Sequence, residues 1–352
     1  MIFNFSKSKV THIACDIPNN QINLIDYIDK IGISKKEANK IINTTGIKKL
    51  AKASASQTSS DFCISSAERI LKTLNKKDIS SIDAIIFVSQ SPDYLIPQTS
   101  NIIQNKLNLK NEILTFDLPL GCSGYVYGLL QANILINSGC NKVLLLAGDT
   151  TTKMINIKDK TVSMVFGDAG SATLIESMKS KSYYHVASDG SNYKNLIIKD
   201  GGFRNQFSKN SLINKEYNDG VYRSDLDINM DGLSIMNFAI KRVPDSISKV
   251  LINSKLTFDQ INLFALHQAN KFMIDYLSKK MKLDKNKVPF NATNYGNTGP
   301  CSIPLLLSEL FSSEKKINLK NTILSGFGVG LSWASCLLNL NQTKFYRINK
   351  LD

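Results

Sequence analysis

The chain has 352 residues, a formal net charge of +14 and 43% hydrophobic residues. This length can bury a large core, either in one big domain or in two fused halves, and the hydrophobic content is ordinary for a globular protein. The sequence contains no apolar run long enough to cross a membrane and no recognisable signal peptide at its start. We therefore expect a cytoplasmic protein with no membrane span.

The positive charge and the cysteines restrict the classes of partner and site. Lysines are scattered along the chain rather than clustered with arginine and aromatic residues, so we expect no nucleic-acid partner. The charge favours either a general compositional bias or an acidic protein partner. The six cysteines form no Cys-x-x-Cys pair and no tight cluster with histidine, which argues against a metal site and against a disulfide framework.

Apolar strand patterns alternate with helical patterns along the chain, which is typical of an α/β layered protein. In the first part they predict strands over 10–17, 84–89, 113–116, 143–148, 162–166 and 171–176, and helices over 22–29, 35–43, 61–74, 97–107 and 125–136. In the second part they predict strands over 259–266, 322–325 and 333–340, and helices over 231–252, 269–281 and 301–310. The polar stretch 200–217 is expected to form a loop.

A faint internal repeat divides the chain into two similar halves. The strand at 84–89 and the helix after it resemble the strand at 262–266 and the helix that follows there. We therefore expect an N-terminal half over 1–180 and a C-terminal half over 181–352, which face each other with a site between them. No linker rich in Pro, Ser or Gly separates the halves, so they should pack as one unit.

One cysteine lies in a setting that favours chemistry. Cys122 stands in the stretch Asp117–Gly124, where an apolar strand enters a turn of small residues and a long apolar helix follows. This layout is typical of a nucleophile elbow, in which a substrate can approach the backbone closely. A helix N-terminus favours thiolate over thiol, so we expect Cys122 to be a nucleophile with a lowered pKa. The other cysteines, Cys301 included, are expected to be structural.

One histidine and two glycine-rich turns are further candidates. His267 ends an apolar strand, where ligand sites gather in open α/β sheets, and we expect it to be functional. His12 and His185 lie within strands and are expected to be structural. The turns at 294–300, which contains Asn297, and at 326–333 are weak signals when each is taken alone, because a capped helix start and a hairpin explain them.

Taken together, these motifs resemble those of the β-ketoacyl-acyl-carrier-protein synthase III family, which are condensing enzymes of the thiolase superfamily. The motifs are Gly-Cys-Ser-Gly at 121–124, His-Gln-Ala-Asn at 267–270, Gly-Asn-Thr at 296–298 and Gly-Phe-Gly-x-Gly-Leu-Ser-Trp at 326–333, with Thr-Gly-Ile at 45–47 and Phe-Gly-Asp-Ala-Gly at 166–170. The resemblance covers nearly the whole chain. It implies an α/β thiolase-like five-layered αβαβα fold with two similar halves, and a homodimer.

The resemblance also implies a Cys-His-Asn triad, here Cys122, His267 and Asn297. Cysteine in this family takes an acyl group from a thioester. A malonyl thioester on acyl carrier protein then loses CO₂, and its carbanion attacks the acyl group. His267 Nε2 and the Asn297 amide would donate hydrogen bonds to the enolate that forms when CO₂ leaves.

Other residues receive supporting roles. We expect an oxyanion site for the intermediates at Cys122, built from its own backbone N–H and that of Val329, beside Gly328. Asn270 is expected to orient the loop that carries His267. Four further residues are candidates for substrate binding: Phe327, Ile96, Lys160 and Lys271. We expect no metal and no bound cofactor, and we expect an acyl carrier protein and an acyl thioester as partners.

The chain also departs from the family pattern. Housekeeping members usually carry a tryptophan and an arginine just before the Thr-Gly-Ile motif, where this chain has Lys40 and Thr44, and an arginine where it has Lys271. The segment 200–227 also looks longer than usual. The primer acyl group therefore stays open, and so does its carrier, which is coenzyme A or acyl carrier protein. Two alternatives remain: transfer of the acyl group from Cys122 to an amine or hydroxyl of a specialised metabolite or sugar precursor, and a non-catalytic scaffold that binds carrier protein.

Overall fold

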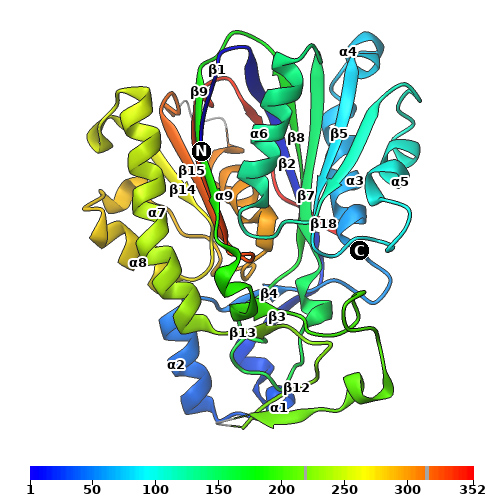
Figure 1. Cartoon of the computed structure of the whole chain (residues 1–352), viewed down its shortest axis with the longest axis vertical. Coiled ribbons are helices and arrows are strands. Elements are labelled where there is room, and N and C mark those ends of the chain that lie inside the picture. The colour runs from blue at the N-terminus through cyan, green and yellow to red at the C-terminus, as the bar shows by residue number, and fades with distance from the viewer. Residues whose placement is uncertain (218–219, 314–316) are drawn as a thin grey trace.

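Helices and sheets alternate in layers in the computed structural model, which describes residues 1–217, 220–313 and 317–352 (Figure 1). Two sheets stand face to face with two helices, α6 (Gly124–Asn137) and α9 (Ser302–Phe311), between them. Further helices cover the outer face of each sheet. This is the α/β, thiolase-like αβαβα arrangement that the sequence predicts.

The first sheet is mixed and belongs mainly to the N-terminal half. Its strand order is β17-β2-β8-β7-β5-β6, with β18 also paired with β2. β5 runs parallel to β6 and β7, whereas β8 runs antiparallel to β7 and β2. Its strands are β2 (Ser8–Pro18), β5 (Ile82–Val88), β6 (Leu114–Leu118), β7 (Lys142–Asp149), β8 (Ala169–Ser177), β17 (Lys344–Phe345) and β18 (Asn349–Leu351).

The second sheet repeats the pairing pattern of the first. Its order is β1-β9-β16-β15-β14. β14 and β15 are parallel, and β16 is antiparallel to β15 and β9. In the first sheet, β5 and β7 are likewise parallel, and β8 is antiparallel to β7 and β2. Its strands are β1 (Ile2–Phe5), β9 (Ser182–Ser188), β14 (Leu263–Leu266), β15 (Thr322–Gly328) and β16 (Ser332–Leu338). The faint sequence repeat is therefore a repeat of sheet topology.

The ends of the chain join the opposite halves. β1 pairs with β9 in the second sheet, while β17 and β18 pair with β2 in the first sheet. Each terminal segment thus binds the half from which it is most distant in sequence. The division of the chain at residue 180 stays a prediction.

The helices cover the sheets as their apolar faces require. α3 (Ser59–Leu71) and α5 (Thr99–Lys106) pack on the outer face of the first sheet, and α7 (Gly232–Ser254) and α8 (Lys271–Lys280) lie on the second. α6 is apolar on all sides, as expected for a helix between two sheets. Strand β7 is a continuous apolar run for the same reason, because helices cover both of its faces.

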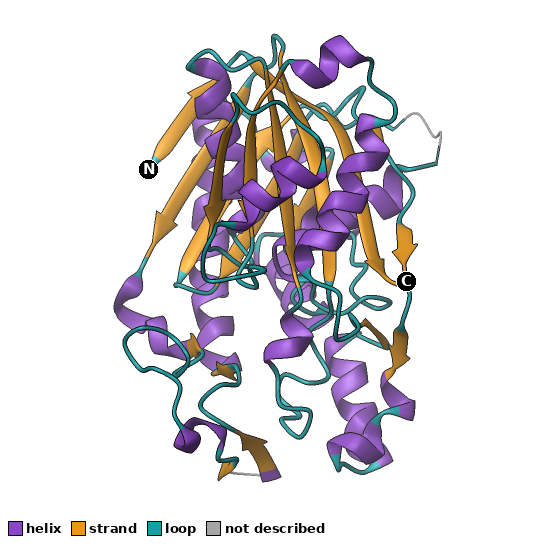
Figure 2. Cartoon of the chain, turned by 90° about the vertical axis from the view of Figure 1, so that its right-hand side faces the viewer, coloured by secondary structure: helices purple, strands orange, loops and turns teal. Residues whose placement is uncertain are grey.

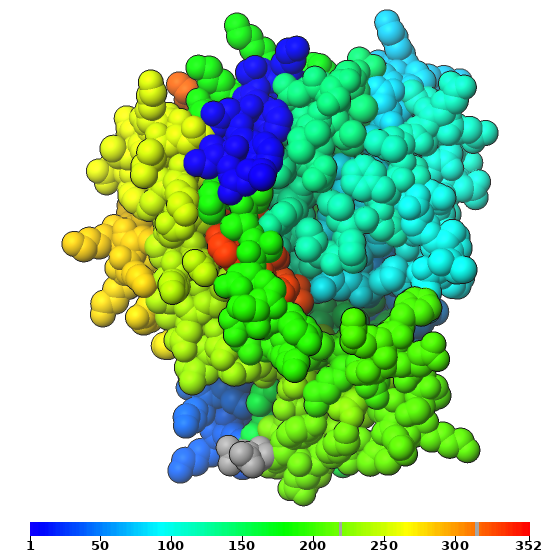
Figure 3. Space-filling view, in the orientation of Figure 1, coloured from blue at the N-terminus to red at the C-terminus, as the bar shows by residue number. Residues whose placement is uncertain are grey.

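A lobe lies below the layered body, where short strands and helices gather (Figure 2). Residues 190–217 and 220–230 cover the lower front of the molecule (Figure 3). The helix α4 (Lys76–Ser80) lies on the upper body. The short elements of the lobe are α1 (Ile28–Ile31), α2 (Lys35–Thr45), β3 (Gln21–Asn23), β4 (Lys49–Ala51), β10 (Leu196–Ile197), β11 (Lys215–Tyr217), β12 (Val221–Arg223) and β13 (Asn229–Met230).

Four predicted elements differ from the structure. The polar stretch 200–217, expected to form a loop, contains a 3-10 turn at Lys209–Leu212 and ends in β11. The run 162–166 is a series of turns rather than a strand, although its apolar side chains are buried like those of a strand. The helix predicted over 22–29 begins instead as β3, because Ile22 pairs with Leu50 of β4. The strand predicted over 259–266 is shortened to β14, because a 3-10 turn at Phe258–Gln260 occupies its start.

Within the described ranges, no helix combines the length and the apolar character that a membrane crossing needs. The cytoplasmic location remains a prediction.

Candidate active site

Cys122 lies in the tight turn between β6 and α6. The Gly124 N–H closes this turn by donating to the Gly121 carbonyl at 2.7 Å. A Cβ at Gly124 would collide with Val88 of β5, so glycine is required for α6 to start directly against this strand. Strand, turn and helix together hold the thiol at the end of the first sheet, in the strand–turn–helix arrangement that the sequence indicates.

The elbow is fastened to the glycine-rich turn that follows β15. Ser123 Oγ lies 2.7 Å from Ser332 Oγ in the interior, and Ser332 Oγ donates to the Val329 carbonyl at 2.7 Å. A Cβ at Gly328 would lie 2.9 Å from the Cys122 sulfur, so only glycine allows the turn to approach this closely. Cys122 therefore sits where the two halves meet.

Cys122 is a partly buried residue, and the pKa of its thiol is raised. Burial raises the pKa of the thiol to about 12, and the nearby Asp149 carboxylate adds to the increase. Backbone N–H groups of Val329 and of Cys122 itself donate toward the sulfur, and these hydrogen bonds act against the increase in the pKa. The predicted lowering of this pKa is wrong, because the loss of water outweighs the N–H groups. These two N–H groups are the ones that the sequence analysis assigns to an oxyanion site.

His267 follows β14 and is buried and neutral. Its backbone N–H donates to the Ser325 carbonyl of β15 at 2.8 Å, and its Nδ1 lies 2.7 Å from Ser302 Oγ. The ring packs edge to face on Phe327, with the centroids 5.6 Å apart. Burial lowers the pKa of His267 to about 3, so the imidazole carries no charge at neutral pH.

Asn297 is fixed by backbone pairing with the turn segment 162–166. Its N–H donates to the Val165 carbonyl at 2.8 Å, and its carbonyl accepts the Gly167 N–H at 3.0 Å. Its side-chain Oδ1 accepts the Gly299 N–H at 3.1 Å. Because this bond engages the amide oxygen, the NH₂ group is the part of the side chain that remains to donate. The segment mistaken for a strand thus positions a predicted site residue.

Single residues link the three predicted triad members. Phe327, which packs on His267, directly precedes the glycine that approaches the Cys122 sulfur. Ser302 follows the turn that carries Asn297 and reaches His267 Nδ1. The three side chains thus belong to one connected region at the ends of β14, β15 and the elbow.

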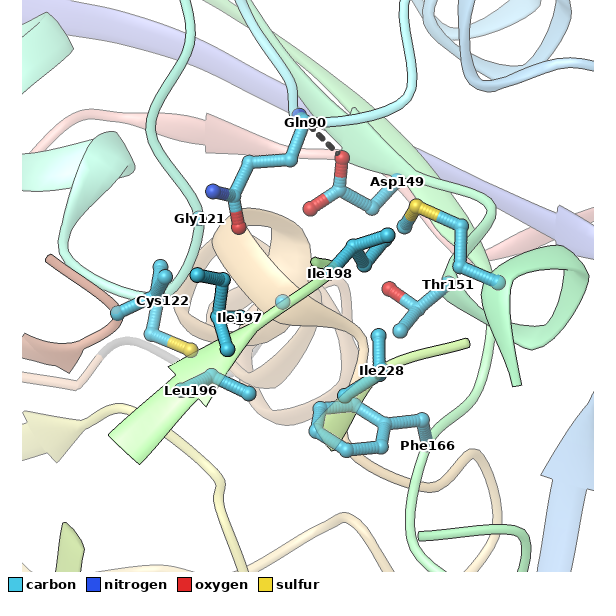
Figure 4. Close-up of a pocket in the computed structure, with 13 residues that line it drawn as sticks. Gln90, Gly121, Cys122, Asp149, Thr151, Phe166, Leu196, Ile197, Ile198 and Ile228 are labelled. Carbon is cyan, nitrogen blue, oxygen red and sulfur yellow. Dashed lines mark hydrogen bonds between the residues drawn. The ribbon is translucent and has the colours of Figure 1, made fainter. Parts of the chain in front are cut away.

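A cavity of about 310 Å³ lies beside the thiol (Figure 4). It is bounded by the ends of β5 and β7, by the elbow and by the β10 segment of the lobe. Neither His267 nor Asn297 lines it, although Gly299 does. The lining residues are Gln90, Gly121, Cys122, Asp149, Thr151, Met154, Phe166, Leu196, Ile197, Ile198, Ile228, Gly299 and Val329.

The remaining predicted site residues lie outside this cavity. Asn270 caps α8 by accepting a backbone N–H at 2.8 Å. Lys160 pairs with a glutamate of α2 at 2.8 Å, and Lys271 pairs with an aspartate on its own helix at 2.7 Å and lies against Gly46. Ile96 is 86% exposed in the loop before α5. A role of Ile96, Lys160, Lys271 and Phe327 in substrate binding stays a prediction, and so does a role of Asn270 in orienting the loop that carries His267.

Most of the residues that line the cavity are not among the site residues predicted from the sequence. Asp149 stands at the C-terminal end of β7, where ligand sites gather, so its position in the chain was an available signal. The apolar run 196–198 enters the cavity from a segment whose length alone attracted notice. Nothing in the sequence indicated that Ser332 and Ser302 would fasten Cys122 and His267.

In the described part of the chain, no group of three or more His, Cys, Asp or Glu side chains is arranged to hold a metal ion. All six cysteines are free thiols.

Two family profiles match the chain. One, described as 3-oxoacyl-[acyl-carrier-protein (ACP)] synthase III, matches residues 116–190, and the other, described as the C terminal of the same enzyme, matches residues 251–340. The first match contains Cys122, and the second contains His267 and Asn297.

Relatives and solved structures match over nearly the full length. A putative 3-oxoacyl-[acyl-carrier-protein] synthase 3 from Campylobacter jejuni is 34% identical over 96% of this chain and 95% of the relative. A β-ketoacyl-[acyl-carrier-protein] synthase III from Clostridium tetani is 35% identical over 89% and 95%. The crystal structure of a 3-oxoacyl-(acyl-carrier protein) synthase from Burkholderia xenovorans superposes with a TM-score of 0.89 at 30% identity, covering 100% of this chain and 99% of that one. The chain therefore belongs to the β-ketoacyl-[acyl-carrier-protein] synthase III family of acyl-transferring condensing enzymes.

Proposed function

We propose that the enzyme condenses an acyl primer with malonyl-acyl-carrier protein, with Cys122 as the residue that carries the acyl group. The observation that supports this most directly is the position of Cys122, a partly buried residue that lines a cavity and has two backbone N–H groups, those of Val329 and of Cys122 itself, directed at its sulfur. Those donors suit the oxyanion of a tetrahedral intermediate better than they suit a resting thiolate, because the thiol is protonated at neutral pH.

The first stage is transthioesterification. The Cys122 sulfur attacks the carbonyl carbon of an acyl thioester, and the carbonyl oxygen becomes an oxyanion that the two N–H groups stabilise. Collapse of this intermediate expels the carrier thiolate, which takes up the proton lost by Cys122. The cavity beside the sulfur is the space that receives the acyl chain.

The second stage is decarboxylative condensation. The malonyl thioester loses CO₂ and leaves an enolate, whose carbon attacks the acyl-Cys122 carbonyl and expels the cysteine thiolate. The neutral imidazole of His267 can donate from Nε2 when the Ser302 hydroxyl donates to Nδ1. The NH₂ group of Asn297 can supply a second hydrogen bond to the enolate oxygen.

The partners follow from the family and the charge. We propose acyl carrier protein as the malonyl carrier, and the net charge of +14 suits an acidic partner. We also propose a homodimer, since the loop before α5 exposes three neighbouring apolar side chains, Tyr94 at 63%, Leu95 at 78% and Ile96 at 86%.

The test measures CO₂ release from malonyl-acyl-carrier protein by the wild type, His267→Ala and Asn297→Ala. Removing one hydrogen-bond donor to the enolate should slow decarboxylation by ~10²–10³-fold. Acylation of Cys122, followed by intact-protein mass, should stay close to the wild-type rate in both variants. Full decarboxylation by Asn297→Ala would contradict its role.

The same assay separates the two alternatives. An acyl-Cys122 adduct that forms normally but is consumed only by an amine or a hydroxyl, never by malonyl carrier, would indicate an acyltransferase. Failure of Cys122 to accept an acyl group from any thioester would indicate a scaffold that binds carrier protein.

A further inference from the structure

The cavity beside Cys122 has two unlike walls (Figure 4). The wall from the lobe is aliphatic and comprises Leu196, Ile197, Ile198 and Ile228. The opposite wall comes from the ends of β5 and β7 and carries Gln90, Asp149 and Thr151. A cavity meant only for a plain hydrocarbon chain would be lined by apolar groups throughout, because buried polar groups without partners cost free energy.

Asp149 is the most informative residue of the polar wall. Its side chain is buried, with 2% exposure. Its Oδ1 accepts hydrogen bonds from the Ser89 hydroxyl at 2.9 Å, the Gln90 N–H at 2.7 Å and the Ser91 hydroxyl at 3.2 Å. Among the residues that the structure describes, nothing donates to Oδ2.

The free oxygen faces the cavity. A Cβ at Gly299, which also lines the cavity, would lie only 2.9 Å from Asp149 Oδ2, so the glycine leaves this oxygen open. Burial raises the pKa of the Asp149 carboxyl to about 7, despite the three hydrogen bonds to Oδ1. The group can therefore accept a hydrogen bond when ionised and donate one when protonated.

Gln90 and Thr151 add donors on the same wall. Within the described ranges, the only hydrogen bond of Gln90 that involves Asp149 or another side chain comes from its backbone N–H, and the Thr151 hydroxyl makes none. The Gln90 amide lies so close to the elbow that a Cβ at Gly121 would collide with its oxygen. The polar wall thus begins beside the cysteine and continues through Asp149 to the buried Thr151.

We propose that the cavity selects a primer whose acyl chain carries a hydroxyl group on one of the carbons near the thioester, recognised by Asp149, Thr151 and Gln90. This inference rests on the proposed function, because it assumes that Cys122 accepts an acyl group. A hydroxyl can donate to Asp149 Oδ2 and accept from the amide or the threonine, while the rest of the chain lies on the aliphatic wall. The volume of about 310 Å³ suits a short acyl chain.

A plain acyl chain of the same size should bind less well. It would cover the carboxyl and the threonine without supplying partners, and a site built around hydrogen bonds discriminates strongly against an analogue that lacks them. We therefore expect the hydroxyl to be preferred by about tenfold or more, the factor that corresponds to a hydrogen bond with a charged group such as the ionised Asp149 carboxylate.

The test compares matched pantetheine thioesters in acylation of Cys122, with the acyl adduct measured over time by intact-protein mass. Each pair has a hydroxyl or a methyl group on the same carbon, as in 3-hydroxybutanoyl and 3-methylbutanoyl, so that the sizes agree. Pairs substituted at carbons 2, 3 and 4 are included, and the best position is scored. The variants are Asp149→Asn and Thr151→Val, both close in shape to the residue replaced, with Met154→Leu as a control on an apolar lining residue.

The wild type should prefer the best hydroxyacyl thioester by at least about tenfold, and Asp149→Asn and Thr151→Val should each reduce this preference severalfold. Met154→Leu should change both members of a pair alike. Equal or better acylation by the methyl analogues, with condensation intact, would overturn this inference alone. A hydroxyl preference without malonyl consumption would support it and contradict the condensation step. If no thioester acylated Cys122, both proposals would fail.

Discussion

The two central helices both begin beside a cysteine, but the surroundings of the two thiols differ. Cys122 precedes α6, is partly accessible, lines the cavity and receives the Val329 N–H. Cys301 directly precedes α9, is fully buried and lies against Cys15. Burial raises the pKa of both thiols, to about 12 for Cys122 and well above the ordinary value for Cys301.

This contrast shows that a helix N-terminus alone does not lower the pKa of a cysteine thiol. Equivalent positions in the two halves offer similar helix dipoles, yet neither thiol is ionised at neutral pH. What separates them is that Cys122 lines a cavity and has the backbone N–H groups of Val329 and of Cys122 itself directed at its sulfur. We infer that Cys122 is activated mainly by stabilisation of the intermediate rather than of the resting thiolate.

The largest effect should come from replacing each of the two cysteines by alanine in turn. Cys122→Ala should reduce acyl-adduct formation by ~10⁴-fold or more, since removal of a nucleophile eliminates the covalent step. Cys301→Ala should leave adduct formation near the wild-type rate and lower the free energy of unfolding by about 1–3 kcal/mol, because it removes a buried sulfur. Intact-protein mass and urea unfolding measure the two quantities.

Cys122→Ala should be as stable as the wild type or nearly so, which serves as the control for folding. An acyl adduct on Cys301, or an adduct that persists in Cys122→Ala, would contradict the difference drawn between the two helix starts.

The second half contributes His267 as a neutral, buried group, and its burial should make the free energy of unfolding depend on pH. The pKa of His267 falls from 6.5 to about 3 on burial. Between these values the unfolded chain binds a proton that the folded chain does not, so stability falls as the pH falls. From pH 6.5 to pH 4, His267 should account for a loss of about 3 kcal/mol in the free energy of unfolding.

His267→Gln isolates this contribution. Its stability should depend less on pH than that of the wild type over the same range, by the same amount, because the variant cannot bind the proton. Denaturant unfolding at several pH values gives the two slopes. Parallel curves for wild type and variant would mean that His267 already binds a proton in the folded protein.

The fold could be predicted from the sequence largely because its signals are local and repeated. Apolar runs such as 143–148 predicted the central strands, and the long apolar pattern after Cys122 predicted α6. The run 162–166 failed because periodicity reports burial, not backbone conformation, and this buried segment turns back on itself. The helix prediction over 22–29 failed at its start because Ile22 pairs with Leu50, which is distant in sequence.

The site could be predicted only in part, for a related physical reason. Cys122, His267 and Asn297 each stand in a turn with its own sequence signal. The cavity wall at 196–198 and the exposure of Asp149 to that cavity depend on how the lobe folds over the first half, which no local pattern encodes. The pKa of Cys122 also depends on burial, and burial outweighs the helix N-terminus from which the lowered value was inferred.

The smallest expected effect concerns Asn270. This residue caps α8 with its side chain, and the two central helices lack such a cap. Its side chain accepts the Met273 N–H at 2.8 Å, whereas α6 and α9 begin without a side-chain cap. Asn270→Ala should lower the free energy of unfolding by about 1 kcal/mol, and Asn270→Ser should restore most of it, since serine also caps helices. If Asn270 instead orients the His267 loop, as the sequence suggested, Asn270→Ala should also slow decarboxylation, and Asn270→Ser should not restore it. Denaturant unfolding and CO₂ release, measured on the same two variants, decide between capping alone and capping combined with orientation.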